Sequence, residues 1–239
     1  MSDKKLLKMY KSFLREYGNS YDKETLDFIK EKFWSLRYST KAPGVLRQIY
    51  SELEAVTEED DIYIAHLEKI RENFHISGHI LDIGCGFYPA FGCLVAKEQI
   101  KLGNGTITLY DPNLVMKKPK YQNMVLRKEM FTPKVNVKDF DLITGIYPCD
   151  ATELIIKKAC ENKKDFYLAM CGCTHFDYFD LMRYGGNPKI YQEYVIYETE
   201  KLLKENKNGE LVVEILEDHY GVDYPILYNK KITSKQSMH

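Results

Sequence analysis

Long apolar runs and net charge are both nearly missing from this sequence of 239 residues. No stretch approaches the roughly 18 apolar residues of a membrane-spanning helix, and the start, Met-Ser-Asp-Lys-Lys, lacks the apolar core of a signal peptide. We therefore expect a cytoplasmic protein without membrane contact. The net charge of −1 excludes a globally basic nucleic-acid-binding protein but leaves room for a local basic patch. An apolar fraction of 44% is enough for a substantial core.

The most informative stretch runs from Gly78 to Pro89. A short apolar strand is followed by Gly84 and Gly86, and then by a helix-compatible segment over residues 89–97. Two glycines let the backbone turn sharply and approach a ligand closely. A ligand beside this turn would also lie near the N-terminus of a helix.

Asp82 and Pro89 indicate which ligand the turn would accept. A dinucleotide fingerprint, G-x-G-x-x-G, has a third glycine where this chain has Pro89. Asp82 places a negative charge just before the turn, and that charge would repel a pyrophosphate and attract a cation. S-adenosylmethionine fits this demand because it carries an ammonium and a sulfonium and has no phosphate.

The segment Leu81-Asp-Ile-Gly-Cys-Gly86 resembles the first motif of class I S-adenosylmethionine-dependent methyltransferases. The resemblance covers roughly residues 75–230, and its alternative is a strand and turn with two incidental glycines. It implies a Rossmann-like domain that binds S-adenosylmethionine. The implied cofactor-binding residues in this motif are Asp82, Gly84, Cys85 and Gly86.

Three residues after the next two expected strands complete the predicted cofactor site. Asp111 ends the strand over residues 106–110, where a carboxylate can accept hydrogen bonds from ribose hydroxyls, although Asp111-Pro-Asn113 can also be only a turn. After the strand over residues 124–127, the resemblance implies an acidic residue for the adenine amino group and an apolar neighbour for the ring. Glu129 and Met130 match in kind, and solvated surface is the alternative.

The fourth expected strand, from Phe140 to Ile146, ends at the place where the resemblance puts the reacting atoms. Amino-methylating enzymes of bases and of glutamine often have an Asn/Asp-Pro-Pro-aromatic turn here, and this chain has Ile146-Tyr-Pro-Cys-Asp150 instead. This departure leaves the reaction chemistry open. The catalytic candidates that we expect around the transferred methyl group are Tyr147, Cys149, Asp150 and His175.

The six cysteines of this long chain suggest reduced thiols and not the disulfide framework of a secreted protein. If the exit of the strand over residues 166–170 stays extended, Cys171, Cys173 and His175 share one face beside Cys149. Their spacing is not that of a C-x₂₋₄-C zinc knuckle. We expect free thiols that line the pocket and no metal, with a zinc site or a reactive thiol as alternatives.

From Gly78 onward, strands and helices alternate, which predicts a parallel sheet with helices on both faces. Strands over residues 210–216 and 224–228 would close it as an antiparallel hairpin. The predicted fold class is therefore α/β, a Rossmann-like, seven-stranded, mostly parallel sheet with a C-terminal antiparallel hairpin and an N-terminal all-helical extension. The expected domains are the helical extension (1–75), the S-adenosylmethionine-binding methyltransferase domain (76–232) and a flexible tail (233–239).

The acceptor of the methyl group is open from sequence alone. Residues 1–47 hold eleven Lys and Arg against six Asp and Glu, a surplus that favours RNA, such as rRNA or tRNA, through basic N-terminal helices. The alternative is that these basic residues only form a solvated helix face. The near-neutral composition favours a small-molecule or protein methyltransferase in which these helices form a lid. The missing amino-methylating motif also allows a cofactor-binding subunit without catalytic turnover.

Overall fold

The computed structural model describes Lys11, Lys23 and residues 61–231, except 87–88, 115, 149–150, 171–187 and 218–222. The chain divides into two compact units, Met1–Asp60 and Asp61–His239, and nearly all described residues belong to the second. The expected helical extension up to residue 60, apart from Lys11 and Lys23, and the expected tail over residues 233–239 lie outside the described residues, and the expected domain limits stay a prediction.

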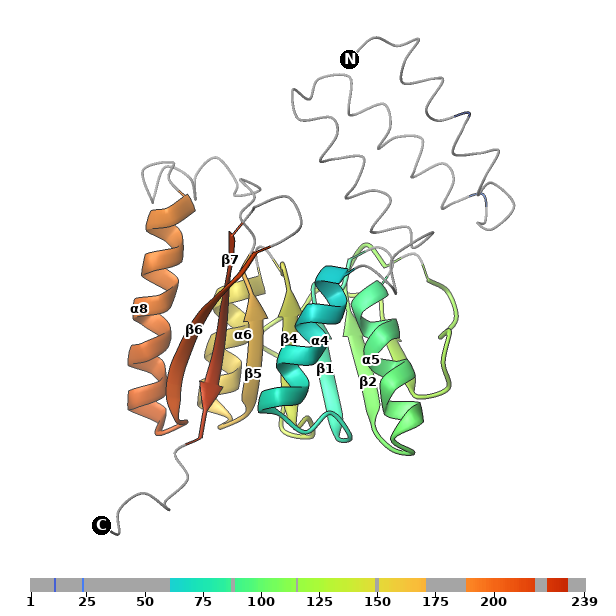
Figure 1. Cartoon of the computed structure of the whole chain (residues 1–239), viewed down its shortest axis with the longest axis horizontal. Coiled ribbons are helices and arrows are strands. Elements are labelled where there is room, and N and C mark those ends of the chain that lie inside the picture. Colours follow the sequence, from blue (N-terminus) through green and yellow to red (C-terminus); the bar gives the residue numbers. More distant parts are fainter. Residues whose placement is uncertain are drawn as a thin grey trace. The chain divides into compact units, whose positions relative to one another are not determined.

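Seven strands of the second unit form one sheet in the order β3-β2-β1-β4-β5-β7-β6 (Figure 1). The first five strands in this order are parallel to one another, whereas β7 runs antiparallel to both β5 and β6. This confirms the predicted α/β fold, including its C-terminal antiparallel hairpin. The strands are β1 (His79–Ile83), β2 (Thr106–Tyr110), β3 (Met124–Arg127), β4 (Leu142–Ile146), β5 (Asp165–Ala169), β6 (Glu210–Glu217) and β7 (Asp223–Lys230).

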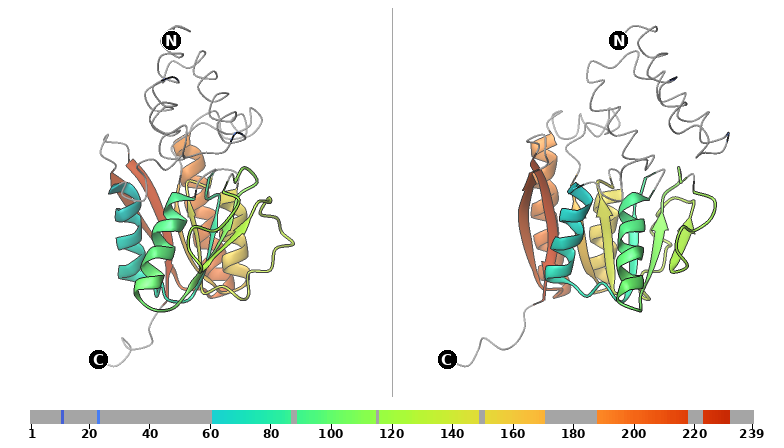
Figure 2. Two further views of the ribbon diagram at one scale, coloured as in Figure 1. Left: turned by 90° about the vertical axis from the view of Figure 1, so that its right-hand side faces the viewer. Right: turned by 45° about the vertical axis from the view of Figure 1, so that its right-hand side comes forward.

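Helices cover both faces of this sheet (Figure 2). Two of them pack on one face, α4 (Asp61–Asn73) and α5 (Ala90–Lys101), and two on the other, α6 (Thr152–Glu161) and α8 (Pro188–Asn206). All five residues of the central strand β4, Leu-Ile-Thr-Gly-Ile, are buried, as expected for a strand covered on both sides. None of the helices in the described ranges has the length and apolar character needed to cross a membrane.

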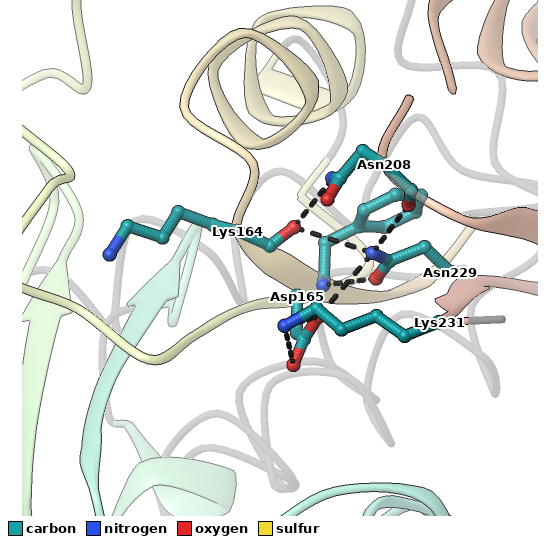
Figure 3. A network of polar contacts seen from close by, with 6 residues as sticks. Lys164, Asp165, Asn208, Asn229 and Lys231 are labelled. Atoms are coloured by element: carbon teal, nitrogen blue, oxygen red, sulfur yellow. Dashed lines mark hydrogen bonds and ion pairs between the residues drawn. The ribbon is translucent and has the colours of Figure 1, made fainter. Parts of the chain in front are cut away.

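Polar contacts connect the amino end of β5, among the parallel strands, with the residues before β6 and the end of β7 (Figure 3). The Asn229 side chain on β7 accepts a hydrogen bond from the Phe166 amide (2.8 Å) and donates one to the Asn208 carbonyl (3.1 Å). Asn208 in turn donates to the Lys164 carbonyl at 2.9 Å, and Lys231 pairs with Asp165 at 2.9 Å. These contacts join β7 to the start of β5, and they hold the antiparallel hairpin in register.

Candidate cofactor and active site

The glycine turn follows β1 at the carboxyl end of the sheet. Gly84 and Gly86 have φ values of +71° and +78°, in the left-handed region that favours glycine. The Gly84 amide donates to the carbonyl of Tyr110 at the end of β2, at 2.8 Å. A Cβ at Gly84 would lie 2.8 Å from the Cα of Pro148, which follows β4. The turn is therefore fixed against the ends of both neighbouring strands, and it has no room for a side chain at position 84.

Asp111 connects this turn to the end of β2. One oxygen of its nearly buried carboxylate accepts from the Gly86 amide at 3.0 Å, and the other accepts from the Asn113 amide at 2.7 Å. The hydrogen bond from Asn113 belongs to the Asp111-Pro-Asn113 turn that the sequence allowed. The hydrogen bond from Gly86 connects Asp111 to the glycine turn. A carboxylate has about four acceptor positions, so these two bonds leave capacity for ribose hydroxyls. The ribose role itself stays a prediction.

Asp82 lies inside β1, with 1% of its surface exposed. The alternation of β1 places it on the same side as Ile80, which packs in the cluster under α4 and α5. Thr144, its partner in the pairing of β1 with β4, donates a hydroxyl hydrogen bond to its Oδ1 at 2.8 Å. Burial raises the pKa of Asp82 to about 7, the Thr144 hydrogen bond opposes this shift, and the Asp111 charge adds to it. At neutral pH the carboxyl group can therefore take either charge state.

Cys85 lies between the two glycines and carries a free thiol. Burial, together with the nearby charges of Asp82 and Asp111, raises the pKa of this thiol well above its usual range. The thiol is therefore protonated at neutral pH, which does not fit a nucleophile.

Tyr147 is the first residue after β4, and its backbone is in a rare conformation. Its φ of +59° lies in the left-handed region, which costs a non-glycine residue roughly 1–3 kcal/mol. The Tyr147 amide donates to the Ala169 carbonyl of β5 at 2.9 Å, which anchors the strained residue. Strain of this kind often persists at functional sites, so the position agrees with its candidacy.

His66 on α4 was not among the predicted site residues, yet it contacts Tyr147. Its Nε2 lies 3.2 Å from the Tyr147 hydroxyl, and its Nδ1 lies 2.8 Å from the hydroxyl of Tyr167 on β5. Both rings meet the imidazole edge to face. Burial lowers the pKa of His66 to about 3, so the ring is neutral at physiological pH. The sequence signal was a histidine on the buried side of an amphipathic helix, next to Leu67.

Glu129 and Met130 follow β3 and are exposed, Met130 by 64%. Burial raises the pKa of Tyr110, and the Glu129 carboxylate raises it further, so Glu129 lies near the end of β2. Their adenine-binding roles stay predictions. Cys149, Asp150, Cys171, Cys173 and His175 lie outside the described residues. Among the residues that are described, no group of three His, Cys, Asp or Glu side chains could hold a metal ion.

The strand order, the C-terminal hairpin and the glycine turn after β1 together make a Rossmann-like, doubly wound sheet, as the resemblance to class I methyltransferases implied. No protein-family model matches the sequence, and no curated protein matches it.

Three solved methyltransferase structures are similar to the structure of this chain. Precorrin-6y C5,15-methyltransferase from Geobacter metallireducens is 14% identical, with a TM-score of 0.41 over 74% of this chain and 91% of its own. The 16S rRNA (adenine(1408)-N(1))-methyltransferase from Catenulisporales acidiphilia is 11% identical, with a TM-score of 0.40 over 72% and 92%.

Coclaurine N-methyltransferase, bound to N-methylheliamine and S-adenosylhomocysteine, is 21% identical, with a TM-score of 0.39 over 69% of this chain; the match spans 58% of its length. Because all three TM-scores are below 0.5, the fold assignment rests on the sheet and the turn of this chain.

Proposed function

We propose that this protein is an S-adenosylmethionine-dependent methyltransferase. The observation that carries the proposal is the pair of buried carboxylates, Asp82 and Asp111, beside a glycine turn that has no room for a side chain at Gly84. Carboxylates attract the ammonium and sulfonium of S-adenosylmethionine and repel a pyrophosphate. Asp111 would accept from the ribose hydroxyls, and Asp82 would supply negative charge at the base of the turn.

The methyl group would be transferred in line. A lone pair of the acceptor atom forms a bond to the methyl carbon while the carbon–sulfur bond breaks, and its electrons leave sulfur neutral as a thioether. An acceptor that starts with a proton then loses it to a base or to water. The protein's main task is alignment. Tyr147, at the exit of β4 beside the turn, would contact the acceptor, and Cys149, Asp150 and His175 are the other candidates.

For the acceptor we propose RNA, because residues 1–47 carry a surplus of five positive charges in a chain whose net charge is −1. Such a surplus can hold phosphates while another surface receives the base. The near-neutral composition of the whole chain instead favours a small-molecule or protein acceptor. A cofactor-binding subunit without turnover is the third possibility, and all three are outcomes of the same experiment.

Purified protein is incubated with S-adenosylmethionine tritiated on its methyl group and with RNA, protein and small-molecule fractions of a cell extract. Label in the RNA fraction, lost in Asp111→Asn and kept in Asp139→Asn, is the expected result. Asp139 is a matched control because it is an exposed carboxylate. Label in another fraction would replace the RNA acceptor. Cofactor binding without label in any fraction would favour the non-catalytic subunit.

Filter binding of total RNA at two salt concentrations tests the RNA acceptor separately. Phosphate contacts weaken steeply with added salt, and the slope should fall when Lys8 and Lys11 become Gln. No RNA retention even at the lower salt concentration would remove RNA from the proposal and leave the methyltransferase activity standing.

A further inference from the structure

The strand β3 lies at one edge of the sheet, and the chain around it is basic. Within the described part of the chain, β3 pairs with β2 alone. Residues 116–129 hold five Lys and Arg against one Glu, a surplus of four positive charges in a chain whose net charge is −1. All five basic side chains are exposed: Lys117, Lys118, Lys120, Arg127 and Lys128.

These basic residues come before and after the strand. The three lysines lie on the segment that leads from the carboxyl end of β2 to the amino end of β3, ahead of the turn in which the Met124 amide donates to the Tyr121 carbonyl at 3.2 Å. Arg127 is the last residue of β3, and Lys128 follows it. With four residues at about 3.3 Å each, β3 is roughly 13 Å long. The positive charge is therefore spread along this edge.

One face of β3 is not covered by a helix. Met124 packs in the cluster under α4 and α5. Val125, which is 40% exposed, and Arg127 lie on the opposite side of the strand, because side chains alternate along it. Residues 128–141, which connect β3 to β4, contain no helix. The side of β3 that carries Arg127 is therefore open to a partner.

The basic edge ends beside the proposed cofactor site. Arg127 is in register with Tyr110 at the end of β2, and Tyr110 is in register with Ile83, which precedes the glycine turn. The Arg127 carbonyl accepts from the Asp111 amide at 3.2 Å. Neighbouring strands lie about 4.8 Å apart, so Arg127 is roughly 10 Å from the end of β1 and roughly 14 Å from the end of β4. A long partner held at this edge can reach both.

Three of the basic side chains are not neutralised by the protein itself. Lys118, Arg127 and Lys128 form no ion pair with a carboxylate of the described ranges. The one carboxylate within residues 116–129 belongs to Glu129, which interacts with the Tyr110 hydroxyl. These three positive charges are therefore available to an anionic partner.

Protection against edge-to-edge pairing does not explain the sign of this charge. Charged side chains on an outer strand keep another strand from pairing with it. The outer strand at the other edge, β6, is acidic instead, with Glu210, Glu214 and Glu217 (Figure 1). Since charges of either sign protect an edge, the positive charge around β3 needs a further explanation.

The kind of charge favours a nucleic acid over a protein as the partner. The cores of protein–protein interfaces are depleted in Lys and other charged residues, whereas protein–nucleic acid interfaces are strongly positive. A nucleic-acid backbone carries its phosphates in a line, which matches basic groups spread along the edge of a strand.

We propose that the β3 edge, defined by Lys117, Lys118, Lys120, Arg127 and Lys128, binds the phosphate backbone of the RNA acceptor and leads the RNA toward the exit of β4. The inference deepens the proposed function and rests on it. It assigns the RNA a binding surface on the sheet itself, in addition to the basic residues of the first 47 positions.

Two double variants of the full chain test this edge. One replaces Lys117 and Lys118 by Gln, and the other replaces Arg127 and Lys128 by Gln. The probe is total RNA in filter-binding titrations between about 50 and 200 mM salt. We expect each double variant to bind about tenfold or more weakly at the lower salt concentration. The slope of log affinity against log salt should fall by about 1 to 2, because two phosphate contacts are lost.

Lys201→Gln combined with Lys204→Gln is the matched control. It removes the same charge from exposed lysines of α8, which lies at the other edge of the sheet (Figure 1). This control should keep the RNA affinity within about twofold and the wild-type salt slope. The Kd of S-adenosylmethionine, measured by calorimetry, should change less than about twofold in all three variants, and the edge variants should raise the KM for RNA while kcat at saturating RNA is kept.

Three results would overturn the inference and leave methyl transfer standing. Wild-type affinity and slope in both edge variants would show that RNA binds elsewhere. Self-association of these variants in analytical ultracentrifugation, with unchanged RNA binding, would show that the charges only protect the edge. Displacement of RNA from the wild-type protein by poly-glutamate at equal charge concentration would replace RNA by an acidic protein partner.

The wild-type protein separates this inference from the function on which it rests. No RNA retained at the lower salt concentration would remove the RNA acceptor and the β3 edge site together, while calorimetric binding of S-adenosylmethionine would keep the methyltransferase proposal. RNA retained by the wild-type protein and equally by both edge variants would remove the edge site alone.

Discussion

The buried polar groups at the two ends of the sheet differ in kind. At the amino end, neutral amides satisfy backbone groups: Gln99 donates to the carbonyls of Ile76 and Gly78, and Asn229 bridges β5 and the residues before β6 (Figure 3). At the carboxyl end, ionisable groups are buried instead. Asp82 is held in the sheet with a raised pKa, and His66 is held neutral in the core.

This difference separates what folding needs from what a ligand needs. A buried amide with its hydrogen bonds satisfied stabilises the fold at no charge penalty. A buried carboxylate is costly to the fold, and such groups gather where binding or catalysis uses them. The amino end therefore accounts for stability, and the carboxyl end for the proposed cofactor site.

Asn229→Ala should give the largest loss of stability. The change leaves the buried amide of Phe166 without its acceptor and removes the bond to the Asn208 carbonyl. We expect the free energy of unfolding to fall by roughly 2–4 kcal/mol, with S-adenosylmethionine affinity unchanged for the folded fraction. Urea titration measures the first quantity and calorimetry the second. A loss of affinity without a loss of stability would break the comparison.

Asp82→Asn should have opposite effects on function and stability. Because the folded pKa, about 7, lies above the ordinary value of 3.8, the stabilising effect of protonated Asp82 is present below pH 3.8 and is lost as the pH rises to 7. The neutral variant should therefore be more stable at pH 8, by on the order of 2 kcal/mol, and equal to wild type near pH 4.

The same variant should bind S-adenosylmethionine roughly 10- to 100-fold more weakly, because the charged partner is gone. Thermal unfolding at both pH values, with calorimetry at pH 8, measures both effects. Asp139→Asn, at an exposed carboxylate, is the control that should change neither.

The affinity of the wild-type protein for S-adenosylmethionine should rise with pH. A cationic ligand selects the ionised form of Asp82, and that form becomes the main one as the pH passes about 7. Between pH 6 and pH 8 we expect a rise of up to about tenfold, with proton release on binding at pH 6. Calorimetry in two buffers of different ionisation enthalpy measures the release, and Asp82→Asn should abolish it.

Lys231→Met should have the smallest effect. Lys231 pairs with Asp165 at the amino end, but its side chain is 62% exposed. We expect less than about 1 kcal/mol of lost stability and no change in cofactor affinity. A larger loss in urea titration would mean that ion pairs, and not the amides of Asn208 and Asn229, hold this edge together.

The sheet could be predicted because its signals are local. Strands β2 and β3 begin and end where the apolar runs predicted, since buried parallel strands read as apolar segments bounded by turn residues. The start of β4 was placed two residues early, at Phe140. Asp141 lies outside the strand, and its carboxylate accepts from the His79 amide.

The site was only partly predictable because its key contacts are long-range. The glycines carry their signal within one short motif, and Asp111 carries its own at the end of the next strand. By contrast, Thr144 is 62 residues from Asp82, and Tyr167 is 101 residues from His66. The expected helical extension over residues 1–75 includes α4, but a helix prediction gives no reason to expect a polar partner for its buried histidine. The raised pKa of Asp82 depends on burial by the whole sheet.

Calorimetric titration of the wild-type protein at pH 8 with S-adenosylmethionine, and separately with NAD, tests the central claim most directly. The buried carboxylates beside the turn predict one S-adenosylmethionine per chain, bound more tightly than NAD, with roughly 1–3 kcal/mol of the binding free energy lost in Asp111→Ala. Tighter binding of NAD, or unchanged S-adenosylmethionine affinity in both Asp82→Ala and Asp111→Ala, would contradict the assignment.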